Sequence, residues 1–255
     1  MPKLKKPWES EQAQQFKAIE TEWHGCRFRS RLEARWAVLF ELLGIEWEYE
    51  PDGFIIDGGI RYLPDFLLRG VRVRRGNSTP IDLYVEVKGF MSDADYKKVD
   101  GFSRYKPIYV VTKLPYEKGK SWHEACEERC YDWPYPFNFK TVDGDNFGAF
   151  LGVNESGEPV LFGDDSTYLN DASTELTDLA YRTAALVRFE HNERPEDHAI
   201  YRDTLKSIRL LKADRWTDLR AECGRRDKYP MPWDSDASAP IPVPRPVPKP
   251  RKKVL

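Results

Sequence analysis

The chain has 255 residues, of which 40% are hydrophobic and 32% charged, and its formal net charge is −2. This length allows one sizeable core, or a core of about 120 residues with a smaller appendage. No apolar run approaches the roughly 18 residues that a membrane-spanning helix needs, and no apolar stretch of a secretory signal follows the charged N-terminus. Four cysteines in a chain this long do not indicate a disulfide scaffold, so we expect reduced thiols and a cytoplasmic protein.

Charge is segregated along the chain. Residues 141–180 contain nine Asp or Glu and no Lys or Arg, whereas residues 200–255 contain fourteen Lys or Arg against seven Asp or Glu, a net of +7. The net charge of the whole chain is therefore a poor guide to its partners, and local patches matter more.

The first forty-odd residues are predicted to be helical. A polar segment over 10–22 leads into a second segment over 28–44, in which Ser30 is a candidate N-cap and Gly44 a candidate C-cap glycine. Apolar residues recur at helical spacing in that second segment: Leu32, Trp36, Leu39, Phe40 and Leu43.

After Gly44 the pattern changes to the alternation of strands. Strands are predicted over 45–50, 54–56, 62–68 and 81–88, followed by a helix over 93–105 and a strand over 107–111. In the strand 81–88, four apolar residues share one face, and the other face carries Asp82, Tyr84, Glu86 and Lys88. The αβββαβ order predicts an α/β (α+β) fold with a mixed central sheet flanked by helices.

The second half of the chain is less informative. A hairpin is expected from 147–153 and 160–162, with helices near 176–187 and 205–211. From residue 239 the proline-rich basic sequence excludes helix and sheet and predicts a disordered tail, which binds nucleic acid, recruits a protein partner or only solubilises the chain. The predicted organisation is a polar segment (1–19), a core (20–118), a β-hairpin and helical extension of unknown role (119–232), and the tail (233–255).

Candidate chemistry is concentrated in Glu86-Val87-Lys88. On a strand these two charged side chains point to the same face, so a carboxylate and an ammonium lie side by side. Asp65, after Pro64 at the start of a strand, and Glu33, on the first apolar helix, offer two further carboxylates. Carboxylates with a lysine suit a Mg²⁺ ion that orients water at a phosphate, so phosphodiester hydrolysis fits better than acyl transfer or redox chemistry. No glycine-rich phosphate loop or G-x-S-x-G motif competes with this interpretation.

These residues resemble a known family. Pro64-Asp65, with Glu86-Val87-Lys88 farther along the chain and Glu33 on an upstream helix, is similar to the motif of the PD-(D/E)xK nuclease superfamily. The resemblance covers about residues 24–115. The wording and order of 28–33, 48–50, 62–68 and 85–89 are similar to phage Holliday-junction resolvases of the endonuclease I type and to related stand-alone phage and prophage nucleases.

The resemblance implies a restriction-endonuclease-like core and a metal-dependent DNA endonuclease, with branched DNA as one expected substrate. Asp65, Glu86 and the backbone carbonyl of Val87 would hold Mg²⁺ or Mn²⁺. Glu33 would complete the site directly or through water, and Lys88 would contact the attacking water or the scissile phosphate. A homodimer is expected of a resolvase, because a four-way junction has two-fold symmetry. The connection between Asp65 and the Glu-x-Lys motif is longer here than in those resolvases and carries an arginine-rich stretch.

Arginines near these motifs are candidates for DNA contact, since phosphate neutralisation releases counterions. The alternatives are an exposed hairpin face for the arginine-rich stretch, and an ion pair with a carboxylate for one of the two arginines beside Glu33. The predicted DNA-binding residues are Arg29, Arg31, Arg72, Arg74 and Arg75.

Other interpretations stay open or are disfavoured. His123, Cys126 and Cys130 lack the paired spacing and fourth ligand of a zinc site, so buried structural thiols are expected instead. The alternative functions are a defence or restriction-type nuclease on duplex DNA, and a catalytically silent DNA-binding or assembly protein on a nuclease fold. The sequence does not specify the DNA structure cut, DNA against RNA, endo against exo action, or the oligomeric state.

Overall fold

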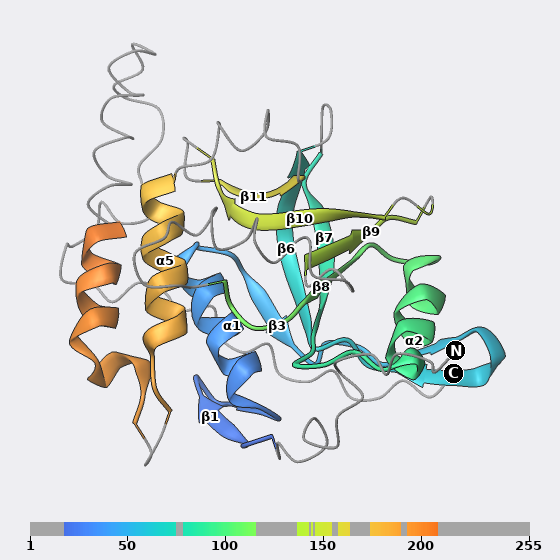
Figure 1. Ribbon diagram of the computed structural model, residues 1–255, viewed down its shortest axis with the longest axis horizontal. Helices are drawn as coiled ribbons and strands as arrows, with labels where there is room; N and C mark the ends of the chain where they lie inside the picture. The colour runs from blue at the N-terminus through green and yellow to red at the C-terminus, as the bar shows by residue number, and fades with distance from the viewer. Residues whose placement is uncertain are drawn as a thin grey trace, which may run out of the picture.

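The computed structural model describes residues 18–74, 79–115, 137–142, 144, 146–154, 158–163, 174–189 and 193–208 (Figure 1). The predictions for the N-terminal segment, the cysteine-containing stretch 116–136 and the basic tail lie outside these residues. None of the helices in the described part of the chain is long and apolar enough to cross a membrane. The helices are α1 (Arg31–Leu42), α2 (Asp93–Ser103) and α5 (Thr174–Leu186), with short 3₁₀ turns at Asp57–Gly59 and Pro195–Asp197, and residues 199–208 are also helical.

The first strands of the described residues form a hairpin where a helix was predicted. Strands β1 (Thr21–Trp23) and β2 (Cys26–Phe28) pair around His24 and Gly25, whose φ angles are 50° and 72°. Two successive positive φ angles are typical of the two-residue turns that join antiparallel strands, and Gly25 adopts such an angle without strain. The predicted helix over 10–22 is therefore wrong for residues 18–22, and residues 23–28 are not helical either. The segment also lacks the apolar periodicity that holds a helix onto a core.

Helix α1 forms where its apolar spacing predicts. Its N-cap is Ser30, whose hydroxyl accepts a hydrogen bond from the Glu33 backbone N–H, as the sequence indicates. Helix α2 begins at a capping box in which Ser92 and Asp95 satisfy each other's backbone N–H groups.

A mixed sheet follows. Strands β3 (Trp47–Tyr49), β6 (Phe66–Arg74), β7 (Ile81–Val87) and β8 (Ile108–Val111) are neighbours, with β6 antiparallel to β3 and β7, and β8 parallel to β7. Strands β4 (Phe54–Ile56) and β5 (Ile60–Tyr62) form a separate two-stranded ribbon beside α2 (Figure 1). The predicted mixed α/β fold with flanking helices is confirmed.

The sheet continues into the second half of the chain. Strands β9 (Phe137–Lys140), β10 (Asn146–Val153) and β11 (Pro159–Gly163) extend it from β8, and β11 pairs with the far end of β6 in parallel. A bulge between Leu68 and Val71, with Gly70 at φ 65°, bends β6 so that it pairs first with β3 and then with β11. The predicted boundary at residue 118 therefore falls within one sheet, which positions the candidate residues of the first half.

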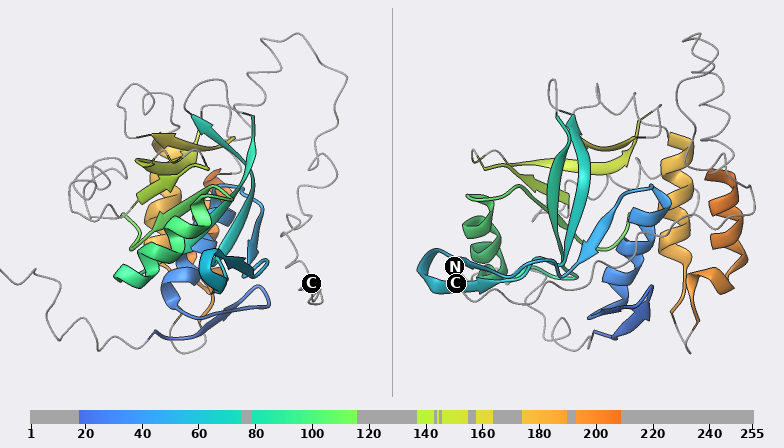
Figure 2. Two further views of the ribbon diagram at one scale, coloured as in Figure 1. Left: turned by 90° about the vertical axis from the view of Figure 1, so that its right-hand side faces the viewer. Right: turned by 180° about the vertical axis from the view of Figure 1, so that it is seen from behind.

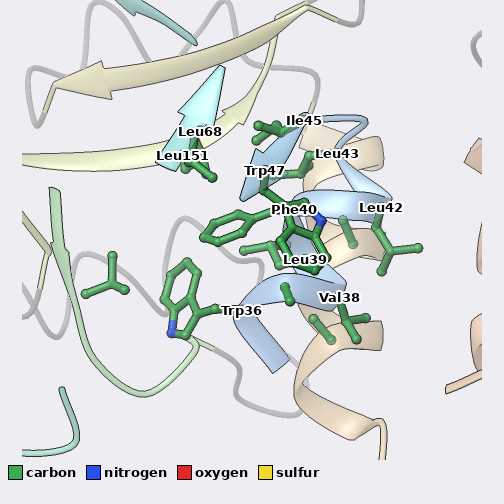
Figure 3. Packing of buried hydrophobic residues seen from close by; sticks show 14 of the residues in the cluster. Trp36, Val38, Leu39, Phe40, Leu42, Leu43, Ile45, Trp47, Leu68 and Leu151 are labelled. Carbon is green, nitrogen blue, oxygen red and sulfur yellow. The ribbon is translucent and has the colours of Figure 1, made fainter. Parts of the chain in front are cut away.

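Helices cover the two faces of this sheet. On one side α1 packs on the strands and against α5, and on the other side α2 packs with the β4–β5 ribbon (Figures 1 and 2). In Figure 3 the side chains of Trp36 and Phe40 extend from α1 toward the strands that carry Leu68 and Leu151. Trp36 is fully buried, so we expect its replacement by alanine to destabilise the fold by about 3–5 kcal/mol. Alternate residues of β6 and β7 enter the two cores, which fixes the face on which each charged side chain lies.

Candidate active site

The start of β6 and the end of β7 bring two predicted carboxylates together. Phe66 pairs with Val85, so Asp65 lies beside Glu86 on the neighbouring strand. The Asp65 backbone N–H donates to the Val85 carbonyl at 3.1 Å, and the Asp65 Oδ2 accepts the Val87 N–H at 2.7 Å. Both carboxylates are buried, with Asp65 only 1% and Glu86 only 4% exposed. Backbone hydrogen bonding therefore fixes their positions.

Glu86 is held from two directions. Lys88 Nζ lies 2.8 Å from Glu86 Oε1, as two residues on one face of a strand predict. The Tyr62 hydroxyl, from the end of β5, donates to Glu86 Oε2 at 2.6 Å. Burial lowers the pKa of Lys88, but the negative charges of Glu86 and Asp65 outweigh that effect and raise it, so Lys88 is an ammonium at neutral pH. Burial and the Glu86 charge raise the pKa of Tyr62, which keeps its hydroxyl a donor.

The surroundings of Asp65 disfavour its ionised form. Burial and the neighbouring Glu86 charge raise its pKa from 3.8 to about 7, although Lys88 and the Val87 N–H act in the opposite direction. The carboxylates therefore resist carrying two full negative charges together, which is the situation that a bound divalent cation relieves.

Arg29 is the second cation at this pair of carboxylates. Its guanidinium forms an ion pair with Asp65 Oδ1, and its Nε lies 3.2 Å from Glu50 Oε1. Its backbone N–H lies 3.0 Å from both Glu33 Oε2 and the Tyr49 hydroxyl oxygen. The sequence left open whether Arg29 contacts DNA or pairs with a carboxylate, and in the structure it pairs with the carboxylate of Asp65.

Glu33 contacts the backbone N–H of Arg29, whereas Asp65 contacts its guanidinium. Its Oε2 accepts the Tyr49 hydroxyl at 2.6 Å, and its Oε1 accepts the Ser30 hydroxyl at 2.8 Å. Glu33 is 6% exposed, and burial together with the Glu33 charge raises the pKa of Tyr49. Glu33 thus lies near the other two carboxylates but reaches Asp65 through Arg29, so its present role is to hold Arg29 and Tyr49.

The donor set fits a hard cation that retains water. In the described part of the chain, no three His, Cys, Asp or Glu side chains converge closely enough to enclose a metal ion. Asp65 and Glu86 supply two carboxylates, and the Val87 carbonyl is directed to the same strand edge as its N–H, because both groups of a strand residue point to one side. Mg²⁺ commonly takes only one or two protein carboxylates and keeps several waters, so this set suits Mg²⁺ better than a metal that needs a full protein cage.

Among the other predicted DNA-binding arginines, Arg72 has a partner away from Asp65 and Glu86. Arg72 lies 3.4 Å from Glu158 of the β10–β11 hairpin, and Arg31 is the partly buried first residue of α1. The neighbouring Arg69 forms ion pairs with Glu48 and Asp82. The side chain of Arg74 and the whole of Arg75 lie outside what the structure describes.

Four residues of the site had no role in the prediction, and Tyr49, which donates to Glu33, is one of them. Tyr62 holds Glu86, Glu50 holds Arg29, and Asp95 of α2 attracts Lys88 electrostatically. Glu50 has a φ of 45°, an uncommon conformation for a residue with a side chain, and its N–H donates to the Asp65 carbonyl at 2.8 Å. Tyr49 and Glu50 belong to a segment that the resemblance includes, but only the fold reveals what they contact.

A scan against protein-family models and searches of curated proteins and of solved structures found no match to this chain. The assignment of a function therefore depends on the sequence motifs and on the geometry of this site.

Proposed function

We propose that the protein is a Mg²⁺- or Mn²⁺-dependent DNA endonuclease of the PD-(D/E)xK type, with Asp65, Glu86 and Lys88 as its catalytic residues. The observation that carries the proposal is the pair of buried carboxylates on adjacent strands, with the Lys88 ammonium 2.8 Å from Glu86. Perturbed carboxylates of this kind are concentrated at functional sites. The succession of α1, β3, β6, β7, α2 and β8 supports a restriction-endonuclease-like core.

In this proposal Asp65, Glu86 and the Val87 carbonyl hold the cation. Once bound, a divalent cation lowers the pKa of coordinated water and offsets charge on the phosphate. The Asp65 carboxylate remains oriented by the Val87 N–H, and the Glu86 carboxylate by the Tyr62 hydroxyl. Such supporting contacts matter, because loss of an outer-shell partner typically lowers metal affinity or activity about 10–100-fold.

Lys88 acts as a donor in this scheme. Its raised pKa keeps it protonated, so it positions the attacking water and stabilises charge on the phosphate oxygens by hydrogen bonding instead of removing a proton. Water attacks phosphorus and releases a proton to solvent, a phosphorus–oxygen bond of the backbone breaks, and the leaving oxygen takes up a proton from solvent.

The test is cleavage of a DNA panel with Mg²⁺ or Mn²⁺. Asp65→Asn, Glu86→Gln and Lys88→Ala are each expected to reduce cleavage by at least about 10³-fold while the protein stays folded. Asp82→Asn is the matched control, because Asp82 is an exposed residue of the same strand and pairs with Arg69. Wild-type cleavage by the Asp65 and Lys88 variants would show that the site assignment is wrong.

The same panel separates the alternative functions. A linear duplex and a four-way junction, each with labelled strands, distinguish a duplex nuclease from a junction resolvase, which makes paired nicks. Tight DNA binding without cleavage in any divalent metal would instead favour a catalytically silent DNA-binding protein.

A further inference from the structure

Arg29 connects the buried carboxylates with the rim of the site. Its peptide N–H is fixed by Glu33 and Tyr49, so its backbone has little freedom. Its side chain runs from Asp65, which is fully enclosed, to Glu50, and is itself 51% exposed. Arg29 is therefore anchored at its root, while its guanidinium lies between the interior and solvent.

The two oxygens of Asp65 have different partners. Oδ2 accepts the Val87 N–H, a hydrogen bond that joins β6 to β7, whereas Oδ1 is paired with Arg29. Each carboxylate oxygen has two lone pairs, but Oδ1 takes no part in the link between the strands, so a cation that leaves this link undisturbed is expected at Oδ1. Arg29 and a metal ion compete for one oxygen atom.

The charges of the site lead to the same conclusion. Arg29 contacts Asp65 and Lys88 contacts Glu86, so each of these two carboxylates already has a cationic partner. A divalent cation bound at these carboxylates would repel both cationic side chains, so one of them is expected to withdraw. Arg29 is better placed to do so, because its side chain is 51% exposed against 27% for Lys88 and it already contacts Glu50 at the rim.

We infer that Arg29 exchanges partners when the site is loaded: its guanidinium yields Asp65 Oδ1 to the metal ion and binds a phosphate of the nucleic acid, while Glu50 keeps it at the rim. The planar guanidinium suits both partners, because carboxylate and phosphate each accept two parallel hydrogen bonds from it. This inference rests on the proposed function and adds that metal binding and nucleic-acid binding favour each other at this site. Glu50 and Arg29 are positioning and binding residues of this exchange.

The decisive measurement is Mn²⁺ affinity without nucleic acid, by calorimetry or by the electron paramagnetic resonance of free Mn²⁺. Arg29→Met removes the competitor, so Mn²⁺ is expected to bind roughly 3- to 10-fold more tightly than to the wild type, while cleavage falls at least about 10-fold. Arg27→Met is the matched control, since Arg27 lies two residues earlier and pairs with Glu20 at the surface. It is expected to change neither quantity.

The inference has two parts, the competition for Asp65 and the phosphate contact, and different results would exclude each. Equal or weaker Mn²⁺ binding by Arg29→Met would exclude the competition, and tighter binding with wild-type cleavage would exclude the phosphate contact. If Arg29→Met does not fold, Arg29→Lys is the variant to test, because lysine keeps the charge but has no planar guanidinium to contact both Asp65 and Glu50. Tighter Mn²⁺ binding than in the wild type is again expected. Unchanged Mn²⁺ binding would exclude the exchange. A wild-type protein that neither binds Mn²⁺ nor cuts DNA would instead refute the proposed function itself.

Discussion

Helix α1 carries a buried carboxylate near its start and a partly buried one near its end, and the two belong to clusters with different electrostatics. Glu33 in the first turn belongs to the candidate active site, whereas Glu41 in the last turn belongs to the His24 cluster, formed by His24, Glu41, Glu196 and Tyr201. In the active site two carboxylates are buried together, and the pKa of Asp65 rises to about 7.

In the His24 cluster the partners of Glu196 outweigh its burial, whereas burial raises the pKa of Glu41 despite the neighbouring His24. Glu196 Oε1 lies 2.9 Å from both His24 Nε2 and Trp23 Nε1, and the Tyr201 hydroxyl donates to Glu41 at 2.8 Å. Although burial raises the pKa of Glu196, its hydrogen bonds with His24 and Trp23 lower it to about 2. The contrast indicates that the His24 cluster stabilises the contacts of α1 with the hairpin β1–β2 and with the helical residues 199–208. In the active site, by contrast, the burial of like charges destabilises the fold.

The largest expected difference between the clusters is in activity. Glu33→Gln keeps the shape of the side chain but replaces one acceptor oxygen by a donor, so it opposes the hydrogen bonds from Ser30, Tyr49 or Arg29. We expect DNA cleavage to fall about 10–100-fold. Glu41→Gln, on the same helix, is the control and is expected to cleave at the wild-type rate. Equal losses in both variants would mean that α1 acts only as a scaffold.

The second difference is in stability. A carboxyl whose pKa is raised in the folded state destabilises the fold increasingly as pH rises from its unfolded value of 3.8 to about 7, and fully above that. Asp65→Asn removes the penalty and is expected to increase the free energy of unfolding at pH 8 by about 1–3 kcal/mol, with little gain at pH 4. Urea unfolding at both pH values measures this. A variant that is less stable than the wild type at pH 8 would contradict the strain attributed to Asp65.

A third expectation concerns the response to metal. Mg²⁺ at ten times its dissociation constant should stabilise the protein by about 1.4 kcal/mol. At a fixed Mg²⁺ concentration this stabilisation should be larger at pH 8 than at pH 5.5, because protons compete with the metal for Asp65 below its pKa of about 7. Thermal melting with and without Mg²⁺ measures it, with Ca²⁺ and Asp65→Asn for comparison. A stabilisation that persists in Asp65→Asn would place the metal elsewhere, for instance near the His24 cluster.

How much of this was predictable differs between the two clusters. Asp65, Glu86 and Lys88 were identified because alternation on a strand and an ordered motif place them on neighbouring elements, and the register of β6 against β7 brings Asp65 and Glu86 together. The contact of Glu33 with the backbone of Arg29 was not predictable, because it depends on the hydrogen bonds that orient the Glu33 carboxylate toward Ser30 and Tyr49.

The His24 cluster gave no signal at all in the sequence. His24 and Glu41 lie more than 150 residues before Glu196 and Tyr201 along the chain, and the two pairs meet only in the folded protein. The β1–β2 turn was missed because a polar segment before a strong helix was assigned to that helix, although Gly25 marks a turn. The connection of β11 to β6 likewise joins residues far apart in sequence, which local patterns do not encode.

The smallest expected effect isolates the charge of His24. Burial lowers the pKa of His24, but Glu196 and Glu41 together raise it above 6.5 against the opposing charge of Arg194. A group with a raised folded pKa stabilises the fold fully below its unfolded pKa of 6.5, and that contribution is lost as pH rises through the folded value. Glu196, whose pKa is about 2, contributes above its ordinary value of 4.5, so the pair stabilises most between about pH 4.5 and 6.5. His24→Gln keeps a hydrogen-bonding side chain without the charge and should lose about 0.5–1 kcal/mol at pH 6 and much less at pH 9, by thermal melting. A loss independent of pH would mean that His24 acts through packing on Trp23 and not through its charge.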